Sequence, residues 1–367
     1  MESMSNLRST SCNRKEKLKF IQMGLVGCGW AGCRAIEAAN ATSRLNVIAI
    51  AERDPIRREQ AGDDNAVPHR YADYRELLDN PDVEAVYLAT SPDGRLQQVL
   101  DTLSAGKHVL VQKPHAIRAP EILEMETAAQ RAGKTLQFCY FMRHFPNNRK
   151  IRRAVLNGAI GDLYHARVFG KYNFIPDLDA NSRWLHVYGQ KGGSLGQHYS
   201  HELNLTWWWM GCPKPEWAFA AKHVLYPQYD GPEGAAEDYF TGILGCEGGK
   251  TIQIDCSRMS HSDSASVVEL YGTTGAITNG GIARFKDGEF VRETVDAPLD
   301  IDHGELPEEV HVFYYELNHF AMAIAGEVAP DVSAPDAYTF MQILDAFYDS
   351  AKSGEKVYIA AESQSLK

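Results

Sequence analysis

The chain has 367 residues, of which 44% are hydrophobic, and its formal net charge is −11. This length allows two or three domains, and this hydrophobic content is enough to build their cores. The negative charge and the scattered Lys and Arg residues argue against a nucleic-acid partner, because binding phosphates requires clustered positive charge. The seven cysteines are an odd number and contain no C-x-x-C pair, so they predict neither a disulfide framework nor a zinc site.

Two features of the sequence concern the location of the protein. Residues 1–18 are polar with mixed charge and lack the apolar core of a signal peptide. No later segment reaches eighteen consecutive apolar residues, which is about what a membrane-spanning helix needs. We therefore expect a flexible N-terminal tail over 1–18 and a cytoplasmic protein without a membrane partner.

A nucleotide-binding turn is predicted near the start of the chain. An apolar run over residues 20–26 leads into Gly-Cys-Gly-Trp-Ala-Gly and then into a helix-like sequence. A strand, a tight turn and a helix in this order typically bind the pyrophosphate of a dinucleotide. Gly27 permits the turn, Gly29 lets the backbone approach the phosphates, and Gly32 lets the helix lie close to the strand. The residues expected to hold the cofactor here are Gly27, Gly29, Trp30, Ala31 and Gly32.

A second apolar run, over residues 46–51, strengthens this prediction. It ends at Glu52, twenty residues after Gly32, where an acidic side chain can accept hydrogen bonds from the adenosine ribose. Arg53 beside it can stack on the adenine or offset the repulsion of a 2′-phosphate. We expect NAD as the cofactor, with NADP as the alternative.

The rest of the first domain alternates between helices and strands. Helices are predicted at 54–59, 74–78, 97–105 and 120–132, and strands at 83–90, 108–111 and 135–140. This alternation predicts a doubly wound α/β Rossmann domain over 19–145. Loops at the carboxyl ends of its strands face the ligand, which adds the cofactor-binding candidates Thr90, Ser91, Pro92, Gln112 and Lys113.

The pattern changes near Pro146. After a helix at 148–157, strand-like runs follow one another at 163–171, 216–226, 237–246, 250–258 and 265–272, with further helices at 200–210, 310–325 and 335–353. Consecutive strands predict a large, mostly antiparallel open sheet, hence an α+β domain over 146–367 for substrate binding and oligomerisation. Its C-terminal helix can pack back on the Rossmann domain.

Several motifs together resemble the glucose-fructose oxidoreductase / inositol dehydrogenase / MocA family. They are the glycine turn at 27–32, GKHVLVQKP at 106–114, RHFP at 143–146, GGSL at 192–195 leading to His201, and ELYGTTGA at 269–276. The resemblance covers nearly the whole chain. It implies a nicotinamide-dependent oxidoreductase that forms homo-oligomers.

The resemblance also implies catalytic residues. Family members place a lysine beside the nicotinamide and an Asp-x-x-x-His segment over the substrate, and the matching positions are Lys113, Gln197 and His201. His201 is suited to taking a proton near neutral pH, whereas the Gln197 amide can form hydrogen bonds but cannot titrate. Gln112 replaces the family's usual Glu, so a desolvated Lys113 should lose its proton more readily. The resemblance further implies a cis Lys113–Pro114 peptide bond.

Aromatic and polar residues in the loop at 172–191 are expected to cover a sugar-like substrate, although such residues also pack in cores. His198 and His201 have no carboxylate or thiol at a spacing that would complete a metal site, so no metal is expected. The substrate-binding candidates are Lys113, Arg143, His144, Tyr172, Trp184, His186, Gln197, His198 and His201.

The combined expectation is hydride transfer between NAD(P) and a secondary ring hydroxyl or ketone of a sugar, glycoside or cyclitol, with Lys113 and His201 handling the proton. Two alternatives stay open: a glycosidase that oxidises its sugar transiently, and a non-catalytic regulator that senses the dinucleotide. Retaining Lys113 and His201 argues against the regulator. Only these two titratable groups can be assigned to the site, which favours simple oxidation or reduction over glycosidic cleavage.

Overall fold

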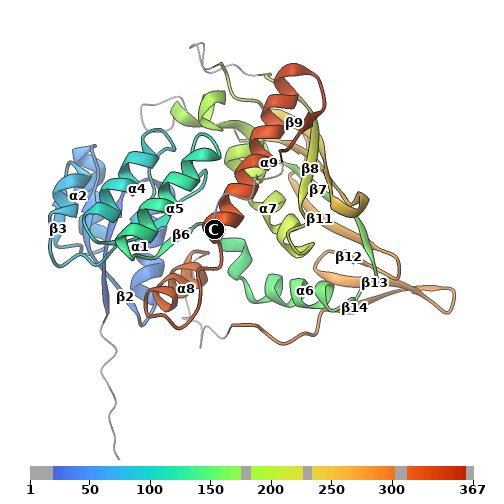
Figure 1. Cartoon of the computed structure of the whole chain (residues 1–367), viewed down its shortest axis with the longest axis horizontal. Coiled ribbons are helices and arrows are strands. Elements are labelled where there is room, and N and C mark those ends of the chain that lie inside the picture. Colours follow the sequence, from blue (N-terminus) through green and yellow to red (C-terminus); the bar gives the residue numbers. More distant parts are fainter. Residues whose placement is uncertain (1–19, 175–182, 226–233, 302–311, 361–367) are drawn as a thin grey trace, which may run out of the picture.

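The computed structural model describes residues 20–174, 183–225, 234–301 and 312–360. Two sheets lie on opposite sides of the molecule, with the long helix α9 (Ala334–Ser353) between them (Figure 1). The predicted tail at 1–18 and part of the substrate loop lie outside the described residues, as does the predicted start of the helix at 310–325.

The first sheet has six strands in the order β3-β2-β1-β4-β5-β6, and all its neighbours are parallel. The strands are β1 (Ile21–Val26), β2 (Leu45–Ala51), β3 (His69–Tyr71), β4 (Ala85–Leu88), β5 (His108–Val111) and β6 (Leu136–Phe138). The central strands are nearly wholly buried because helices cover both faces, which explains their continuous apolar sequences. The predicted doubly wound fold is confirmed. The edge strand β3 was not predicted. Its sequence, His-Arg-Tyr, is exposed or half-buried and shows no hydrophobic pattern.

Helices flank this sheet as the sequence pattern requires. They are α1 (Trp30–Ala41), α2 (Pro55–Asp64), α3 (Tyr74–Leu78), α4 (Arg95–Ser104) and α5 (Pro120–Ala132). Asp54 begins α2 by accepting hydrogen bonds from the backbone N–H groups of Ile56 and Arg57, and Asp73 caps α3 in the same way. Each cap fixes where the helix starts and therefore where the loop before it faces.

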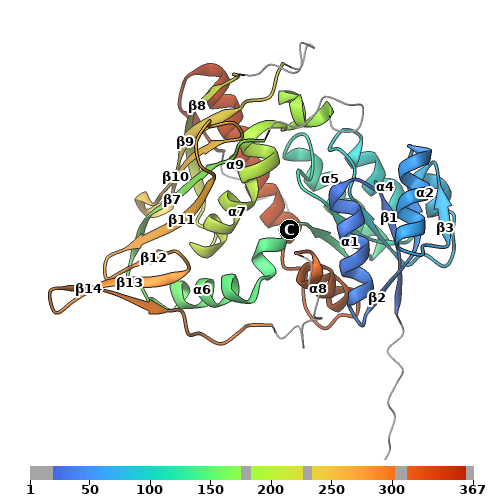
Figure 2. The same ribbon diagram turned by 180° about the vertical axis from the view of Figure 1, so that it is seen from behind.

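The second sheet has nine strands in the order β14-β13-β12-β11-β7-β10-β9-β8-β15. All its pairs are antiparallel except β7 with β10, which confirms the mostly antiparallel open sheet. Its strands are β7 (Leu163–Lys171), β8 (Pro215–His223), β9 (Tyr239–Cys246), β10 (Thr251–Ser257), β11 (Ala265–Gly272), β12 (Ala276–Thr278), β13 (Gly281–Lys286), β14 (Glu289–Thr294) and β15 (Val357–Tyr358). Strands β12 to β15 were not predicted; β13 and β14 form a hairpin that extends away from the rest of the sheet (Figure 2).

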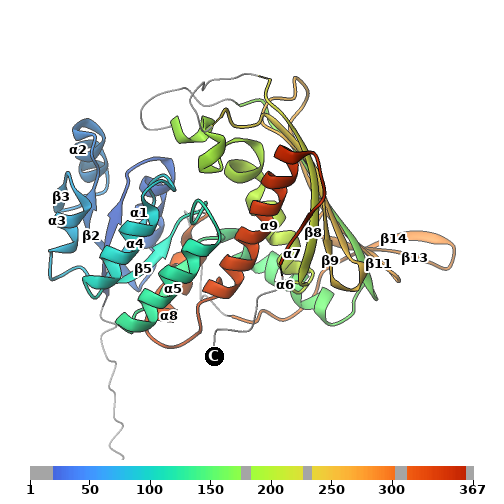
Figure 3. The ribbon, with the colours of Figure 1, turned by 45° about the horizontal axis from the view of Figure 1, so that its top comes forward.

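Helices cover one face of this sheet. They are α6 (Pro146–Leu156), α7 (Ser200–Trp209) and α9, whereas α8 (Tyr314–Ile324) lies against the Rossmann domain. Helix α9 runs along β8 and also packs against α5 and β6 of the Rossmann domain, while α8 packs against α1 (Figure 3). None of the described helices is long and apolar enough to cross a bilayer.

One buried residue of α9 connects the two domains directly. Asp345 Oδ2 accepts a hydrogen bond of 3.0 Å from the backbone N–H of Ala119, at the start of α5. Its other oxygen, Oδ1, lies 2.6 Å from Nζ of Lys191, just before the segment that carries the predicted catalytic residues. The position of that segment relative to the Rossmann domain is therefore set partly by this single carboxylate.

Candidate active site

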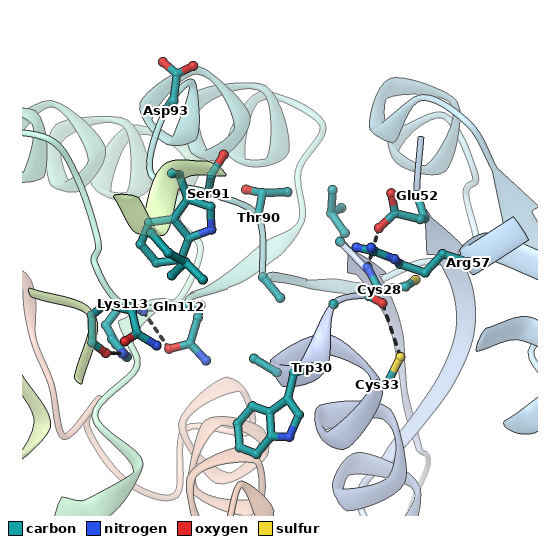
Figure 4. Close-up of a pocket in the computed structure, with 18 of the residues that line it drawn as sticks. Cys28, Trp30, Cys33, Glu52, Arg57, Thr90, Ser91, Asp93, Gln112 and Lys113 are labelled. Atoms are coloured by element: carbon teal, nitrogen blue, oxygen red, sulfur yellow. Dashed lines mark hydrogen bonds between the residues drawn. The ribbon is translucent and has the colours of Figure 1, made fainter. Parts of the chain in front are cut away.

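A cavity of about 1400 Å³ lies between the two domains and is lined by residues of both. One end is formed by the glycine turn and Glu52, and the other by Lys113 and the residues that precede α7. Figure 4 shows Glu52 and Lys113 on opposite sides of the cavity with Trp30 between them. A cavity of this volume, with these residues at its two ends, suits a dinucleotide with a small substrate at one end.

The glycine turn has the geometry that the sequence predicts. Gly27 has a φ of +94°, and a Cβ on Gly32 would lie 2.0 Å from the carbonyl oxygen of Gly27, so only glycine lets α1 approach this closely. The space in front of Gly29 is open, and Gly29, the N-cap residue of α1, has no side chain that could cap the helix. An open, uncapped helix N-terminus is a suitable site for the pyrophosphate of NAD. Gly32 itself lies behind the turn and does not line the cavity.

Glu52 lies at the adenosine end with both carboxylate oxygens held by backbone groups. Oε2 accepts a hydrogen bond of 2.8 Å from the N–H of Cys28, and Oε1 accepts one of 3.1 Å from the N–H of Asp54. Arg53 and Arg57 line the same end. The acid is thus fixed in position next to the turn that would hold the phosphates.

The loops after β4 and β5 are joined by a residue that the sequence analysis did not identify. The buried guanidinium of Arg95 donates to the backbone oxygens of Thr90, Gln112 and Pro114. Thr90 and Ser91 line the cavity, whereas the buried Pro92 does not. The Lys113–Pro114 bond is cis, which confirms that prediction.

Hydrogen bonds hold Gln112 and Lys113 in position. Gln112 Nε2 donates to the hydroxyl of Tyr87 at 2.7 Å, and its Oε1 accepts from the backbone N–H of Lys113 at 2.7 Å. Lys113 Nζ donates to the backbone oxygen of Gln197, which joins the two domains across the cavity. Burial lowers the pKa of Lys113 to about 8, against the opposing effect of Glu202. This agrees with the expectation that Lys113 loses its proton more readily than an ordinary lysine.

A π-helix, η4 (Ser194–Tyr199), positions the second group of residues and runs directly into α7. It is anchored from behind, because Leu195 N donates to Oε1 of Glu237 at 2.9 Å and Gly196 N donates to the hydroxyl of Tyr348 at 2.9 Å. The cavity is lined by four residues of η4 and α7, namely Gln197, His198, His201 and Glu202. Their spacings of four residues place them along one side of the helical segment.

The two histidines of this segment are neutral near pH 7. Burial lowers the pKa of His198 to about 3, and burial together with nearby Lys113 lowers the pKa of His201 well below 6.5. The ring of His201 packs against Phe141, with centroids 4.4 Å apart, and edge-on to Tyr140 at 5.8 Å. His201 can therefore exchange hydrogen bonds with a ligand, but it is a weak base in this surrounding.

Glu202 is a functional candidate that the sequence analysis missed. It lines the cavity beside Lys113, and burial raises its pKa to about 7. Its Oε2 is buried without a hydrogen-bond partner among the described residues. Glu202 thus adds a titratable group to Lys113 and His201, the two that the sequence analysis could assign to the site. The signal that could have revealed Glu202 is its spacing of four from His198 on a helical segment.

The substrate-binding candidates separate into two groups. Tyr172 and Trp184 line the cavity, and Tyr172 stacks on Tyr199 with ring centroids 5.4 Å apart. His186 is buried and does not line the cavity. Tyr172 and Trp184 therefore stay candidates, while His186 lies outside the lining of the cavity.

Arg143 and His144 also lie outside the cavity, which corrects the expectation that they shape it. Arg143 Nε donates to Oδ1 of Asn204 at 2.7 Å, and its Nη1 lies 3.0 Å from Oδ2 of Asp336. The buried ring of His144 packs against His319 at 4.7 Å. These side chains face the interior, where Asp336, Asn204 and the ring of His319 contact them.

Within the described residues, no group of three or more His, Cys, Asp or Glu side chains is placed to hold a metal ion. The six cysteines in that part of the chain are free thiols.

Known proteins match this chain over both of its domains. The model of the oxidoreductase family NAD-binding Rossmann fold (GFO_IDH_MocA) matches residues 21–140, and that of the family's C-terminal alpha/beta domain matches 152–359. Trans-1,2-dihydrobenzene-1,2-diol dehydrogenase of Mus musculus is 29% identical over 68% of this chain and 76% of the mouse protein.

Solved structures show the same fold. Levoglucosan dehydrogenase in complex with NADH and levoglucosan superposes with a TM-score of 0.80 at 20% identity, covering 94% of this chain and 100% of that one. A putative myo-inositol dehydrogenase from Sinorhizobium meliloti 1021 superposes with a TM-score of 0.74 at 20% identity, covering 93% and 100%. With both domains matched by its models, the chain belongs to the Gfo/Idh/MocA family of oxidoreductases and carries that family's NAD-binding Rossmann domain.

Proposed function

We propose that this oxidoreductase transfers a hydride between NAD and a secondary ring hydroxyl or ketone of a sugar, glycoside or cyclitol. The observation that carries the proposal is the place of Lys113, whose amine lies in the cavity that also contains the glycine turn and Glu52. When bound, the nicotinamide accepts the hydride from the carbinol carbon. The residues around Lys113 must then hold the carbinol oxygen and handle its proton.

Lys113 is the first of these residues. A pKa of about 8 means that both its ammonium and its amine form are populated near neutral pH, so it can hold the oxygen and exchange a proton with it. We assign His201 the neutral form, which forms a hydrogen bond to the substrate instead of storing its proton. Gln197 is assigned the same hydrogen-bonding role, since an amide cannot titrate.

The substrate class is supported by the cavity wall and by the relatives. Tyr172 and Trp184 offer aromatic surfaces among polar groups, which is typical of sites for ring compounds with several hydroxyl groups. The relatives are named for levoglucosan, myo-inositol and a dihydrobenzene diol. We further propose that the protein works in the cytoplasm and forms a homo-oligomer. Sedimentation of the purified full chain would test the oligomeric state.

The test is a panel of cyclitols, sugars and glycosides incubated with NAD or NADP. Absorbance of the reduced nicotinamide is followed together with mass detection of keto products. A keto product that forms in proportion to reduced NAD supports the proposal. Absence of both signals across the panel in either direction, with NAD bound, would contradict it and favour a dinucleotide-sensing regulator.

A second candidate is a glycosidase that oxidises its sugar only transiently. Glu202 favours it, because cleavage after oxidation needs a further titratable group to remove the proton next to the ketone. Incubation with a nitrophenyl glycoside in deuterated water separates the two. Release of nitrophenol, with deuterium at the carbon next to the oxidised one and no net NADH, would replace the first proposal by this one.

A further inference from the structure

Among the described acidic residues that line the cavity, Glu202 is distinguished by a buried carboxyl oxygen without a hydrogen-bond partner. It lies in the first turn of α7, next to His201 in sequence and in the part of the cavity that contains Lys113. Its Oε2 is buried and finds no hydrogen-bond partner among the described residues. Burying an oxygen without a partner is unfavourable, so its retention calls for a functional reason.

The groups that face Glu202 carry little charge. Those from neighbouring elements are Lys113 after β5, Tyr172 after β7, Tyr199 and His198 of η4, Cys256 of β10 and, on α7 itself, His201. Burial raises the pKa of both tyrosines and of the Cys256 thiol, and it lowers the pKa of both histidines, so all five are neutral near pH 7. Among these described groups, Lys113 and Glu202 are the two that titrate close to neutral pH.

The oxidation needs a proton acceptor that Lys113 cannot always supply. With a pKa of about 8, Lys113 is mainly an ammonium at pH 7, and in that form it donates hydrogen bonds and cannot take a proton. The neutral His201 is a poor acceptor because burial disfavours its charged form. Among the described residues at this end of the cavity, the remaining base is the carboxylate of Glu202.

We propose that Glu202 is a catalytic proton-transfer residue of this site, a role that rests on the proposed function. As the C–H hydride leaves for the nicotinamide, the O–H proton of the same carbinol moves to Oε2 of Glu202. The carbinol becomes a ketone, NAD becomes NADH, and the carboxylate becomes a neutral carboxyl group. The ammonium of Lys113 holds the oxygen throughout, and reduction runs through the same steps in reverse.

The first measurement is the pH dependence of kcat/KM for oxidation by wild type and by Glu202→Gln. In wild type the rate should rise as Glu202 loses its proton near pH 7, since only the carboxylate can accept the proton. In the variant this rise should disappear, and the rate at pH 7 should fall by about 10²–10⁴-fold, with a remainder that increases only as Lys113 becomes an amine.

Glu237→Gln is the matched control. Burial likewise raises the pKa of Glu237 to about 7, and its Oε2 also lacks a partner among the described residues. It supports η4 from behind and does not line the cavity. This variant should keep the rise near pH 7 whatever its absolute rate. Loss of the rise in Glu237→Gln, or its survival in Glu202→Gln, would overturn the proposal.

A second measurement needs no substrate. In protein labelled with carbon-13 at the glutamate carboxyl groups, the NMR signal that disappears in Glu202→Gln identifies Glu202. The midpoint of its titration should lie near pH 7. In Lys113→Met, which removes the neighbouring positive charge, the midpoint should move to higher pH. A midpoint at the ordinary value of glutamate, unaffected by Lys113→Met, would refute the assignment. If wild type shows this titration but oxidises no member of the panel, the proposed function fails.

Discussion

Two glutamates occupy opposite ends of one cavity, and their surroundings differ in the way that their tasks require. Glu52 has both oxygens held by backbone N–H groups, which fixes the carboxylate next to the glycine turn. Glu202 is left with a buried oxygen that has no partner among the described residues, and burial raises its pKa to about 7. A carboxyl group held by fixed donors is suited to binding, whereas the raised pKa of Glu202 lets it change its protonation state near neutral pH.

The two ends of the cavity should also respond differently to substitutions. At the adenosine end, substitutions should change affinity for the cofactor and leave the reaction steps untouched. At the reaction end, they should change rates and pH dependence while the cofactor still binds. The following experiments test this separation.

The largest effect is expected for Lys113→Met. Turnover should fall by about 10²–10⁴-fold because the group that holds the reacting oxygen and exchanges its proton is lost, while NAD affinity by calorimetry should stay nearly unchanged. Lys286→Met, in the exposed hairpin of β13 and β14, is the control and should keep full turnover. Near wild-type activity of Lys113→Met on a true substrate would exclude the proton-transfer role.

A smaller effect is expected for Glu52→Gln. The neutral amide no longer repels a 2′-phosphate, so the preference for NAD over NADP should fall by roughly tenfold, about 1.4 kcal/mol, with little change in the pH profile. Glu59→Gln, on the exposed side of α2, is a suitable control. Tighter binding of NADP than of NAD by the wild-type protein would show that Arg53 and Arg57, and not Glu52, decide the choice.

The smallest effect is expected for Gln112→Glu. A carboxylate can accept hydrogen bonds from both Tyr87 and the N–H of Lys113, so the loop should keep its conformation. The added negative charge should raise the pKa of Lys113 and move the limb of the pH profile that depends on it to higher pH, with a similar maximal rate. A shift to lower pH would mean that Lys113 does not set that limb.

The local parts of the site could be predicted from the sequence. The glycine turn, Glu52 and Lys113 each depend on residues close together in the chain, where a strand end or a turn dictates which way the backbone faces. Contacts between distant segments could not be predicted in this way. Arg95 acts through three backbone oxygens of separate loops, and no spacing in the sequence reveals that.

The same reason accounts for the residues that were misplaced. Arg143 and His144 are polar and follow a strand of the Rossmann sheet, which normally indicates a ligand site. Here Asp336, from the beginning of α9, satisfies Arg143, and its position depends on how the C-terminal helix returns to the first domain. Glu202 was overlooked for a related reason, since its raised pKa comes from burial by several elements at once.

Asp345 has a consequence for the cooperativity of unfolding. Its two oxygens hold the start of α5 in one domain and Lys191 in the other, within the helix that packs on both. If either domain melted alone, the hydrogen bond between the backbone N–H of Ala119 and Asp345 would be lost, and the domain that stays folded would keep a donor or acceptor without its partner, which is unfavourable. The two domains should therefore lose their structure together, and NAD bound to the first should protect the second from heat to the same extent.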